Sequence, residues 1–527
     1  MSFIERVTTG RAGIALRLAA ATLAGALGSV AFSVAAANWF LLVSLAVLFL
    51  VTVRTETKKE GFGVGWLWGL AFFSIGLRWC YGSLHDHGQL PAVLSVAAIV
   101  LLAGVLSLFI GAVTGLTRAF PISRRLKLIV LLPTLWSVFE LLRGVEPAGF
   151  GWLSIGYAYS TDFFGAWAPL AGVYGVGFVV VLTVGLAVEL LFPAEDKKPW
   201  LKTLDAIAIG ALALVTLALN DVTYSERGPK LEVRLVQPDL PVMMAYRPAE
   251  AAARIDRAVA MSNRSALGKP LDLIVWPEST IVTPLRDGLD NTALAAVDVT
   301  EKTGAAVVFN AFFREGPGRY YNAMWMAESN HRPARLIYRK HHLVPFGEFV
   351  PTGFRWFVDA LGIPMADQLR GPVGGDPFNV AGIQAAGGIC YENMFGEELR
   401  HAWDKANPGF ILNTANLGWF TDAVLPQFTA MSAMRARETA RPLIQAVQNA
   451  HSALIGPDGK TQRLASKGAQ NLDMTVVTAT GSPTPFVRYG HWPLIGLLVV
   501  LLAGSLTLAF RAVRVGSKPN DKASLGY

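Results

Sequence analysis

The chain has 527 residues, which is too long for one ordinary domain, and its formal net charge is +8. Hydrophobic residues make up 53% and charged residues only 16%, and the mean hydropathy of +0.41 is unusual for a soluble protein. The basic residues are scattered between apolar runs and form no single patch, which argues against nucleic-acid binding. Only two cysteines are present, so a disulfide framework and a Cys-rich zinc site are both excluded.

Long apolar runs fill the first 219 residues and return only near residue 489. A helix needs roughly 20 apolar residues to cross a bilayer. The runs therefore predict eight membrane-spanning helices, at residues 12–32, 36–53, 62–80, 92–116, 127–143, 165–193, 203–219 and 489–510. The first is not a cleaved signal peptide, because further spans follow at once. This pattern divides the chain into a membrane domain of seven helices (1–219), an inserted α/β domain (220–488), and an eighth helix with a tail (489–527).

Short-loop charge predicts the orientation of these helices. Basic residues occupy the N-terminal tail, every second connection and the C-terminal tail: Arg6, Arg11, Arg54, Lys58, Lys59, Arg118, Arg124, Arg125, Lys127, Lys197, Lys198, Lys202, Arg511, Arg514, Lys518 and Lys522. The alternate connections, 81–91 and 144–164, contain no Lys or Arg. Because basic loops stay inside, both termini are expected in the cytoplasm and residues 220–488 on the outer side.

The two connections without basic residues are rich in aromatic residues and glycine. Such residues usually anchor helices at the interface, and the alternative is a rim that admits lipid beneath the inserted domain. His85 and His87 have one Asp between them and no further partner, which makes a weak metal site. No metal is therefore expected.

Segments of strand and helix character alternate in the inserted domain. Strands are predicted at residues 231–236, 271–275, 305–309, 383–389, 410–412 and 444–447, and helices at 254–267 and 431–439. This alternation predicts a layered α/β domain. Neither GxGxxG nor GxxxxGK[ST] occurs, so the sequence gives no support for nucleotide binding.

Cys390 stands at the end of a strand-like segment that contains Gly387 and Gly388, with a polar stretch behind it. A tight strand-to-helix turn would lift its thiol out as a nucleophile, whose pKa falls near cations or a helix N-terminus. The alternative is a small buried hydrophobe.

Two more sparse motifs supply a carboxylate and an ammonium. Glu278, in Val-Trp-Pro-Glu-Ser, follows a buried strand at the edge where α/β proteins build sites, and we expect a general base there rather than a loop glutamate. Lys340, in Arg-Lys-His-His-Leu-Val-Pro-Phe-Gly-Glu, would by composition be an ordinary basic residue. Beside a thiolate it would lower the thiol pKa and bind an oxyanion. Glu348 and Glu392 are placed to hold this lysine or to assist proton transfer.

Together these three motifs resemble the Glu-Lys-Cys triad of the nitrilase superfamily. The run Lys-His-His-Leu-Val-Pro-Phe-Gly-Glu-Phe-Val-Pro, joined to eight spans, resembles the apolipoprotein N-acyltransferase family. The resemblance implies an αββα sandwich on the periplasmic face of the bacterial inner membrane, with Glu278 as base, Lys340 as oxyanion stabiliser and Cys390 as nucleophile. It further assigns supporting roles to four residues: Glu348, Glu392, Tyr391 and Asn322.

The activity implied by the resemblance is the last step of bacterial lipoprotein maturation. A glycerophospholipid would give a fatty acyl chain to Cys390 as a thioester, and the α-amine of diacylglyceryl-cysteine on an apolipoprotein would receive it. No cofactor is required, and a monomer in the lipid bilayer is expected. Two positions depart from the family pattern: Tyr246 stands where tryptophan is expected, and Leu417 where aspartate is common.

Three other interpretations remain open from the residues. A membrane-tethered hydrolase would use the same triad but pass the acyl group to water. A lipid-binding scaffold would have no activity at all. A Cys80–Cys390 disulfide is conceivable in an oxidising compartment, although a free thiol explains Cys390 better.

Overall fold

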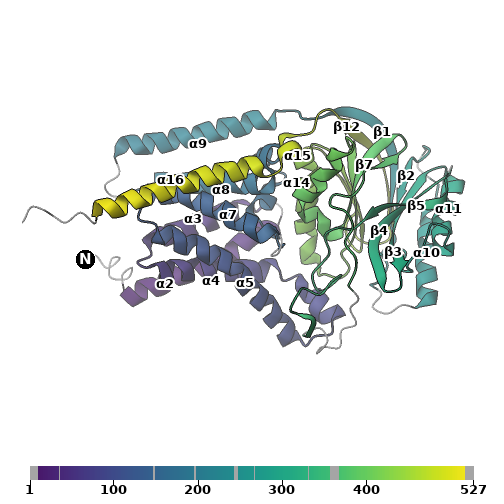
Figure 1. Ribbon diagram of the computed structural model, residues 1–527, viewed down its shortest axis with the longest axis horizontal. Helices are drawn as coiled ribbons and strands as arrows, with labels where there is room; N and C mark the ends of the chain where they lie inside the picture. The colour runs from purple at the N-terminus through teal and green to yellow at the C-terminus, as the bar shows by residue number, and fades with distance from the viewer. Residues whose placement is uncertain are drawn as a thin grey trace, which may run out of the picture.

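The computed structural model describes residues 10–34, 36–145, 149–194, 198–242, 247–265, 268–329, 331–356 and 367–516. Within these residues, a helical part and a part built on two β-sheets lie end to end along the long axis of the molecule (Figure 1). Tyr246, one of the two departures from the family pattern, falls outside the described residues.

A helix lies at each of the eight ranges predicted to cross the membrane. These are α2 (Gly10–Ser29), α3 (Trp39–Arg54), α4 (Lys58–Gly76), α5 (Ala92–Ala119), α7 (Leu132–Gly144), α8 (Ala168–Leu191), α9 (Pro199–Asn220) and α16 (Trp492–Gly516). Five stretches are long and apolar enough to cross a membrane: Gly10–Phe32, Ala92–Ala119, Phe163–Leu191, Pro199–Asn220 and Trp492–Arg514. The helix α3 is apolar but shorter.

At two of the predicted ranges, a separate short helix or turn precedes the main helix. The short helix α6 (Arg124–Leu126) and a π-helical turn (Lys127–Leu131) lead into α7, so the predicted range 127–143 is not one regular helix. The eighth range was predicted to start at residue 489, but Tyr489 ends a separate short helix, α15 (Pro485–Tyr489). Gly490, with φ of +57°, then turns the chain before α16 begins at Trp492.

The first sheet has the strand order β12-β1-β2-β3-β4-β5, and the second β11-β10-β9-β8-β7-β6. The bounds are β1 (Glu226–Gln237), β2 (Leu273–Val275), β3 (Ala306–Gly316), β4 (Arg319–Glu328), β5 (His331–Arg339), β6 (Phe378–Val380), β7 (Ile383–Ile389), β8 (Phe410–Asn416), β9 (Leu443–Gln448), β10 (Ala453–Ile455), β11 (Thr461–Leu464) and β12 (Gln470–Thr480). The strands β1, β2 and β3 are parallel to one another, as are β7, β8 and β9. The six predicted strands fall on these six parallel strands.

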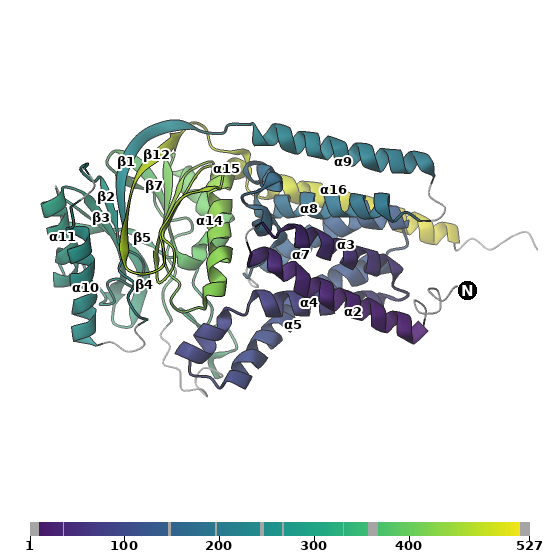
Figure 2. The same cartoon turned by 180° about the vertical axis from the view of Figure 1, so that it is seen from behind.

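Helices cover the outer face of each sheet, which gives four layers in the order αββα (Figure 2). The helices α10 (Pro248–Ser262) and α11 (Asn291–Thr303) pack on the first sheet, where Ile255 joins Ile274 in one buried cluster. The helix α14 (Leu425–Thr439) packs on the second sheet through Ala433 and Ile411. The helix predicted at 254–267 therefore begins earlier, at Pro248, and also ends earlier, at Ser262. The helix predicted at 431–439 begins six residues earlier, at Leu425.

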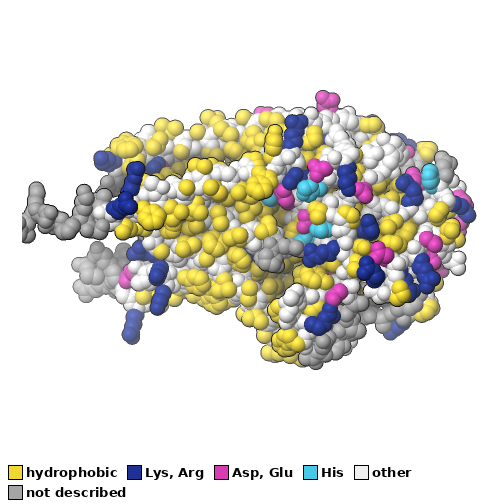
Figure 3. Space-filling model, in the orientation of Figure 1, with side chains coloured by type: hydrophobic (Ala, Val, Ile, Leu, Met, Phe, Trp, Pro, Cys, Tyr) yellow, Lys and Arg dark blue, Asp and Glu magenta, His cyan; other side chains and the backbone are white. Residues whose placement is uncertain are grey.

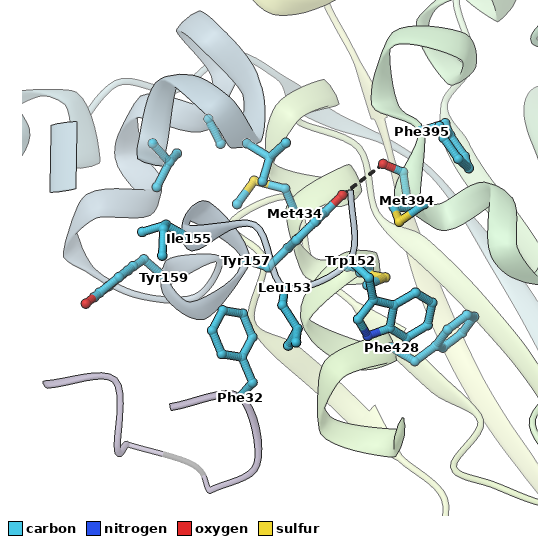
Figure 4. Close-up of a cluster of buried hydrophobic side chains, with 14 of the residues drawn as sticks. Phe32, Trp152, Leu153, Ile155, Tyr157, Tyr159, Met394, Phe395, Phe428 and Met434 are labelled. Atoms are coloured by element: carbon cyan, nitrogen blue, oxygen red, sulfur yellow. Dashed lines mark hydrogen bonds between the residues drawn. The ribbon is translucent and has the colours of Figure 1, made fainter. Parts of the chain in front are cut away.

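The outer face of α14 lies against the helical part, so the two parts share one apolar core. Phe428 and Met434 of α14 belong to the same buried cluster as Trp152 and Leu153, which lie between α7 and α8 (Figure 4). The second sheet is therefore supported from the side of the helical bundle.

Candidate active site

Glu278, Lys340 and Cys390 come together at one edge of the sandwich, where three strands end. Glu278 follows β2, Lys340 follows β5, and Cys390 follows β7. The Nζ atom of Lys340 lies 4.0 Å from Oε1 of Glu278. The backbone N–H of Asn416, at the end of β8, donates to Oε2 of Glu278 at 2.8 Å and also faces the Cys390 thiol. All three side chains are buried, with Cys390 the most exposed at 9%.

Cys390 is held in a conformation that side-chain-bearing residues rarely adopt. Its φ is +52°, and it opens a 3₁₀ helix, η6 (Cys390–Met394). Such left-handed residues cost of order 1–3 kcal/mol and cluster at functional sites. Ser279, directly after Glu278, also has a positive φ of +62°. The predicted turn after β7 is present, and the helix that follows it is 3₁₀ rather than α.

A network of carboxylates surrounds the lysine. Nζ of Lys340 donates to Oε1 of Glu348 at 2.9 Å. The side-chain amide of Asn322 donates to Glu278 at 2.8 Å and to Glu348 at 2.9 Å, so one amide bridges the two carboxylates. The second oxygen of Glu348 accepts the Val344 backbone N–H at 2.8 Å. Glu348 therefore holds Lys340, while Asn322 fixes both acids.

Asn310 completes this network and was missed by the sequence analysis. Its Nδ2 donates to the side-chain oxygen of Asn322 at 2.8 Å, which fixes the orientation of that amide. Its own side-chain oxygen accepts the Ser279 backbone N–H at 3.2 Å. The available signal was a polar residue within the apolar run of β3, since polar side chains rarely lie in a buried strand without a partner.

Burial and neighbouring charges set the protonation of the site. Burial raises the pKa of Cys390, and the nearby Glu278 carboxylate raises it further, so the thiol is neutral in the resting site. Burial also raises the pKa of Glu278, against the opposing charge of Lys340. Burial alone would lower the pKa of Lys340, but Glu348 and Glu278 outweigh it and the pKa lies above its usual value. This arrangement suits a base that takes the thiol proton when substrate binds.

The sequence analysis placed Glu392 to hold Lys340 or to assist proton transfer. In the structure its hydrogen bonds instead stabilise the turn that Cys390 begins. One oxygen accepts the backbone N–H of Ile389 at 2.7 Å and the Tyr338 hydroxyl at 2.9 Å. The other accepts the backbone N–H groups of His341 and His342 at 2.7 and 3.1 Å. This single carboxylate therefore ties the segment after β5 to the segment after β7.

Tyr391 turns away from the three central residues and toward the helical part. Its hydroxyl donates to the main-chain oxygen of Gly149 at 3.1 Å, and its ring stacks on Trp152 with centroids 6.2 Å apart. Tyr391 and Glu392, which are neighbours in the sequence, thus connect the same turn to different parts of the molecule.

The two histidines considered as metal ligands both bind main-chain oxygens. A ring nitrogen of His85 lies 2.8 Å from the oxygen of Leu90, and one of His87 lies 2.9 Å from that of Gly418. Across the described part of the chain, no group of three or more His, Cys, Asp or Glu side chains is arranged to hold a metal ion. Cys80 and Cys390 are both free thiols.

Family profiles match the two parts of the chain separately. The profile described as "Carbon-nitrogen hydrolase" matches residues 232–481, and the one described as "Apolipoprotein N-acyltransferase N-terminal domain" matches residues 24–186. The sheet-containing part therefore has the carbon-nitrogen hydrolase fold. A solved CN-hydrolase superfamily protein from Xanthomonas campestris is 18% identical and covers 47% of this chain and 91% of its own, with a TM-score of 0.37.

Relatives that align over most of the chain identify the family more closely than the carbon-nitrogen hydrolase fold does. A protein of Ralstonia nicotianae named apolipoprotein N-acyltransferase is 34% identical over 507 residues, which cover 94% of this chain and 95% of the relative. One of the same name from Nitrosomonas europaea is 33% identical, covering 88% and 92%. The chain belongs to the apolipoprotein N-acyltransferase family. It is accordingly a membrane-associated acyltransferase of lipoprotein biosynthesis.

Proposed function

We propose that this protein transfers a fatty acyl chain from a glycerophospholipid to the α-amine of diacylglyceryl-cysteine on apolipoproteins, through a thioester on Cys390. The observation that carries the proposal is the position of Lys340, 4.0 Å from Glu278 and hydrogen-bonded to Glu348, at the edge where Cys390 opens its turn. A nucleophile, a base and a fixed positive charge in one buried place are the parts that acyl transfer needs.

In the first half of the reaction, Glu278 accepts the proton of Cys390 and the sulfur attacks the carbonyl carbon of the lipid ester. The oxyanion that forms is stabilised by the Lys340 ammonium. As the ester bond breaks, Glu278 returns the proton to the departing oxygen, and a lysophospholipid leaves. A thioester between Cys390 and the fatty acid remains.

In the second half, the amine of the lipoprotein attacks the thioester carbon, again with Lys340 opposite the oxyanion. Glu278 takes a proton from the amine, the C–S bond breaks, and the proton passes to the sulfur. The products are an N-acylated lipoprotein and the free thiol, so the two substrates bind in turn by a ping-pong scheme. No cofactor takes part in this scheme.

We further propose that all eight helices cross the bacterial inner membrane, with both termini cytoplasmic and residues 220–488 in the periplasm. In support, a broad apolar surface covers the helical part, and Lys and Arg side chains gather at its end far from the sheets (Figure 3). Ion pairs occur at that end too, where Arg124 meets Glu189 and Arg125 meets Asp205. An embedded monomer avoids extracting acyl chains from the bilayer, at about 0.8 kcal/mol per CH₂.

The direct test is the intact mass of the purified protein after incubation with phospholipid and no amine acceptor. Wild-type protein and Cys80→Ala are expected to gain one fatty-acyl mass, and Cys390→Ala is expected to gain none. Adding a diacylglyceryl peptide with a free amine should remove the increment and acylate the peptide.

Other outcomes point to the competing functions. Free fatty acid released without peptide acylation would identify a hydrolase that uses the same three residues. A Cys390→Ala protein that still supports lipoprotein maturation in cells would favour a scaffold and contradict the thioester.

A further inference from the structure

The connection between α4 and α5 touches a loop that leads directly to the candidate active site. This connection includes the π-helical turn η2 (Gly82–His87), and the loop runs from Asn416 to Thr421 after β8. The backbone N–H of Thr421 donates to the oxygen of Trp79 at 3.3 Å. A Cβ atom added at Gly82 would lie 3.0 Å from the Thr421 nitrogen, which is a tight contact with the backbone of the loop.

Two side chains of the connection hold main-chain oxygens of this loop. The Ser83 hydroxyl donates to the oxygen of Trp419 at 2.8 Å. Nε2 of His87 lies 2.9 Å from the oxygen of Gly418, and because a carbonyl only accepts, this nitrogen carries the proton. The His87 ring also meets the Trp419 ring edge-on, with centroids 5.4 Å apart. The middle of the loop is therefore fixed by the helical part.

The other end of the loop reaches the reacting groups. The Gly418 N–H donates to the side-chain oxygen of Asn416 at 3.0 Å, so residues 416 and 418 form one closed turn. The N–H of Asn416 in turn donates to Glu278 at 2.8 Å and faces the thiol of Cys390. A shift at Gly418 would thus move a backbone donor that binds Glu278 and lies near Cys390.

We propose that Ser83 and His87 are positioning residues, which hold the 416–421 loop so that the Asn416 N–H stays aimed at Glu278 and Cys390. This inference rests on the proposed function, because it assigns Glu278 as the base and Cys390 as the nucleophile. Leu417 is buried in this turn. His87 thereby gains a role that the metal-site hypothesis did not offer.

The physical effect of the Asn416 N–H is to stabilise negative charge. Hydrogen bonds to an ionised group favour its charged form. Lys340 and Glu348 are the other charged groups that act on Glu278 and Cys390. Displacing the N–H would raise the pKa of the thiol further and slow its conversion to the attacking thiolate.

The test measures alkylation of Cys390 by iodoacetamide against pH, read from the mass of its tryptic peptide in full-length protein. His87→Leu and Ser83→Ala are expected to slow alkylation, by about tenfold for His87→Leu, and to move the pH profile to higher pH. His87→Gln should restore most of the rate because its amide can donate to Gly418. Asp86→Asn, an exposed change in the same turn, should match wild type.

The inference is overturned if folded His87→Leu and Ser83→Ala both keep the wild-type profile, or if His87→Gln is as slow as His87→Leu. Thermal unfolding of each variant separates misfolding from repositioning, and Ser83→Ala removes only one oxygen should the leucine variant not fold. Absence of any acyl-enzyme in wild type would instead defeat the proposed function, while the alkylation profiles would still report on the loop.

Discussion

The hydroxyl of Tyr157 donates a hydrogen bond to the main-chain oxygen of Met394 at 2.8 Å, across 237 residues of sequence (Figure 4). Tyr157 lies in a short 3₁₀ helix (Ile155–Tyr159) of the helical part, and Met394 ends the η6 turn that Cys390 begins. An Arg435 nitrogen approaches the same oxygen at 3.3 Å. The helical part thus contacts the far end of the nucleophile turn directly.

Tyr157→Phe should loosen this turn without emptying the space that the ring fills. Losing one net hydrogen bond costs about 0.5–1.5 kcal/mol, so a lower unfolding temperature and slower acyl-enzyme formation are expected. Intact mass spectrometry over time measures the second effect.

Tyr159→Phe is the matched control for this change. The Tyr159 hydroxyl binds the oxygen of Asn38 at 3.0 Å, away from η6. It should cost similar stability but leave the rate of acylation unchanged. Equal slowing in both variants would show that the Tyr157 bond has no particular part in holding the nucleophile.

We expect Gln427 of α14 to contribute strongly to the interface between the helical part and the sheet-containing part. Its side-chain oxygen accepts the indole N–H of Trp79 at 3.0 Å and of Trp152 at 2.6 Å, and its nitrogen donates to the oxygen of Gly76 at 2.9 Å. Gln427→Leu would strand both buried indoles, at about 1–3 kcal/mol for each group left without a partner. Hydrogen exchange in residues 76–90 should rise in this variant.

Thr429→Ala on the same helix provides the comparison, since its hydroxyl bonds only within α14, to Leu425. Exchange in residues 76–90 should stay at the wild-type level there. If hydrogen exchange in residues 76–90 is no faster in Gln427→Leu than in Thr429→Ala, other residues hold the interface together.

Glu348→Gln should slow acylation, because it removes a charge beside Lys340 and its NH₂ must face one of the donors that the carboxylate accepts. Glu348 is the carboxylate that bonds Lys340 at 2.9 Å, and its charge helps keep the lysine pKa high. Without that charge the ammonium is less well held opposite the oxyanion, and we expect a loss of about tenfold or more, which corresponds to 1.36 kcal/mol. Single-turnover acylation of Cys390 measures it.

Glu315→Gln is a suitable control, because that glutamate pairs with Arg319 on the exposed end of β3. Exposed pairs contribute about 0–1 kcal/mol, so wild-type acylation is expected. A Glu348→Gln enzyme as fast as Glu315→Gln would remove Glu348 from the reaction.

The sequence predicted the six strands that have parallel neighbours. The strands β1, β2, β3, β7, β8 and β9 are the parallel ones, and parallel strands appear as apolar runs because helices and a second sheet cover them. The six strands that pair only in antiparallel fashion were missed: β4, β5, β6, β10, β11 and β12. The edge strand β11 offers no apolar signal, since all four of its residues are exposed.

Contacts across the two parts were beyond prediction for a different reason. The bond between Trp79 and Gln427 joins residues 348 apart in the chain, and periodicity reports only on neighbours. The motifs predicted which residue types form the site. The amide of Asn310 and the N–H of Asn416 reach Glu278 and its neighbours only because strands far apart in the sequence pair in the sheets.

The stability of the protein should depend on pH through Glu392. Burial raises its pKa from 4.5 to about 7, because the cost of a buried charge exceeds the help from its hydrogen-bond donors. A folded-state pKa above the unfolded one gives stability that is fully present below about 4.5 and is lost as pH rises through about 7. The difference corresponds to about 3 kcal/mol.

Glu392→Gln removes this titration and also turns an amide NH₂ toward N–H and O–H donors, so the variant is less stable at every pH. The difference in stability between wild type and this variant should be largest near pH 5 and shrink toward pH 8. Only wild type is stabilised when residue 392 takes up a proton. Unfolding temperatures of both proteins at these two pH values measure the trend. If that difference in stability stays constant or grows toward pH 8, the four donors keep Glu392 ionised at both pH values. Their effect on its pKa would then be larger than that of burial.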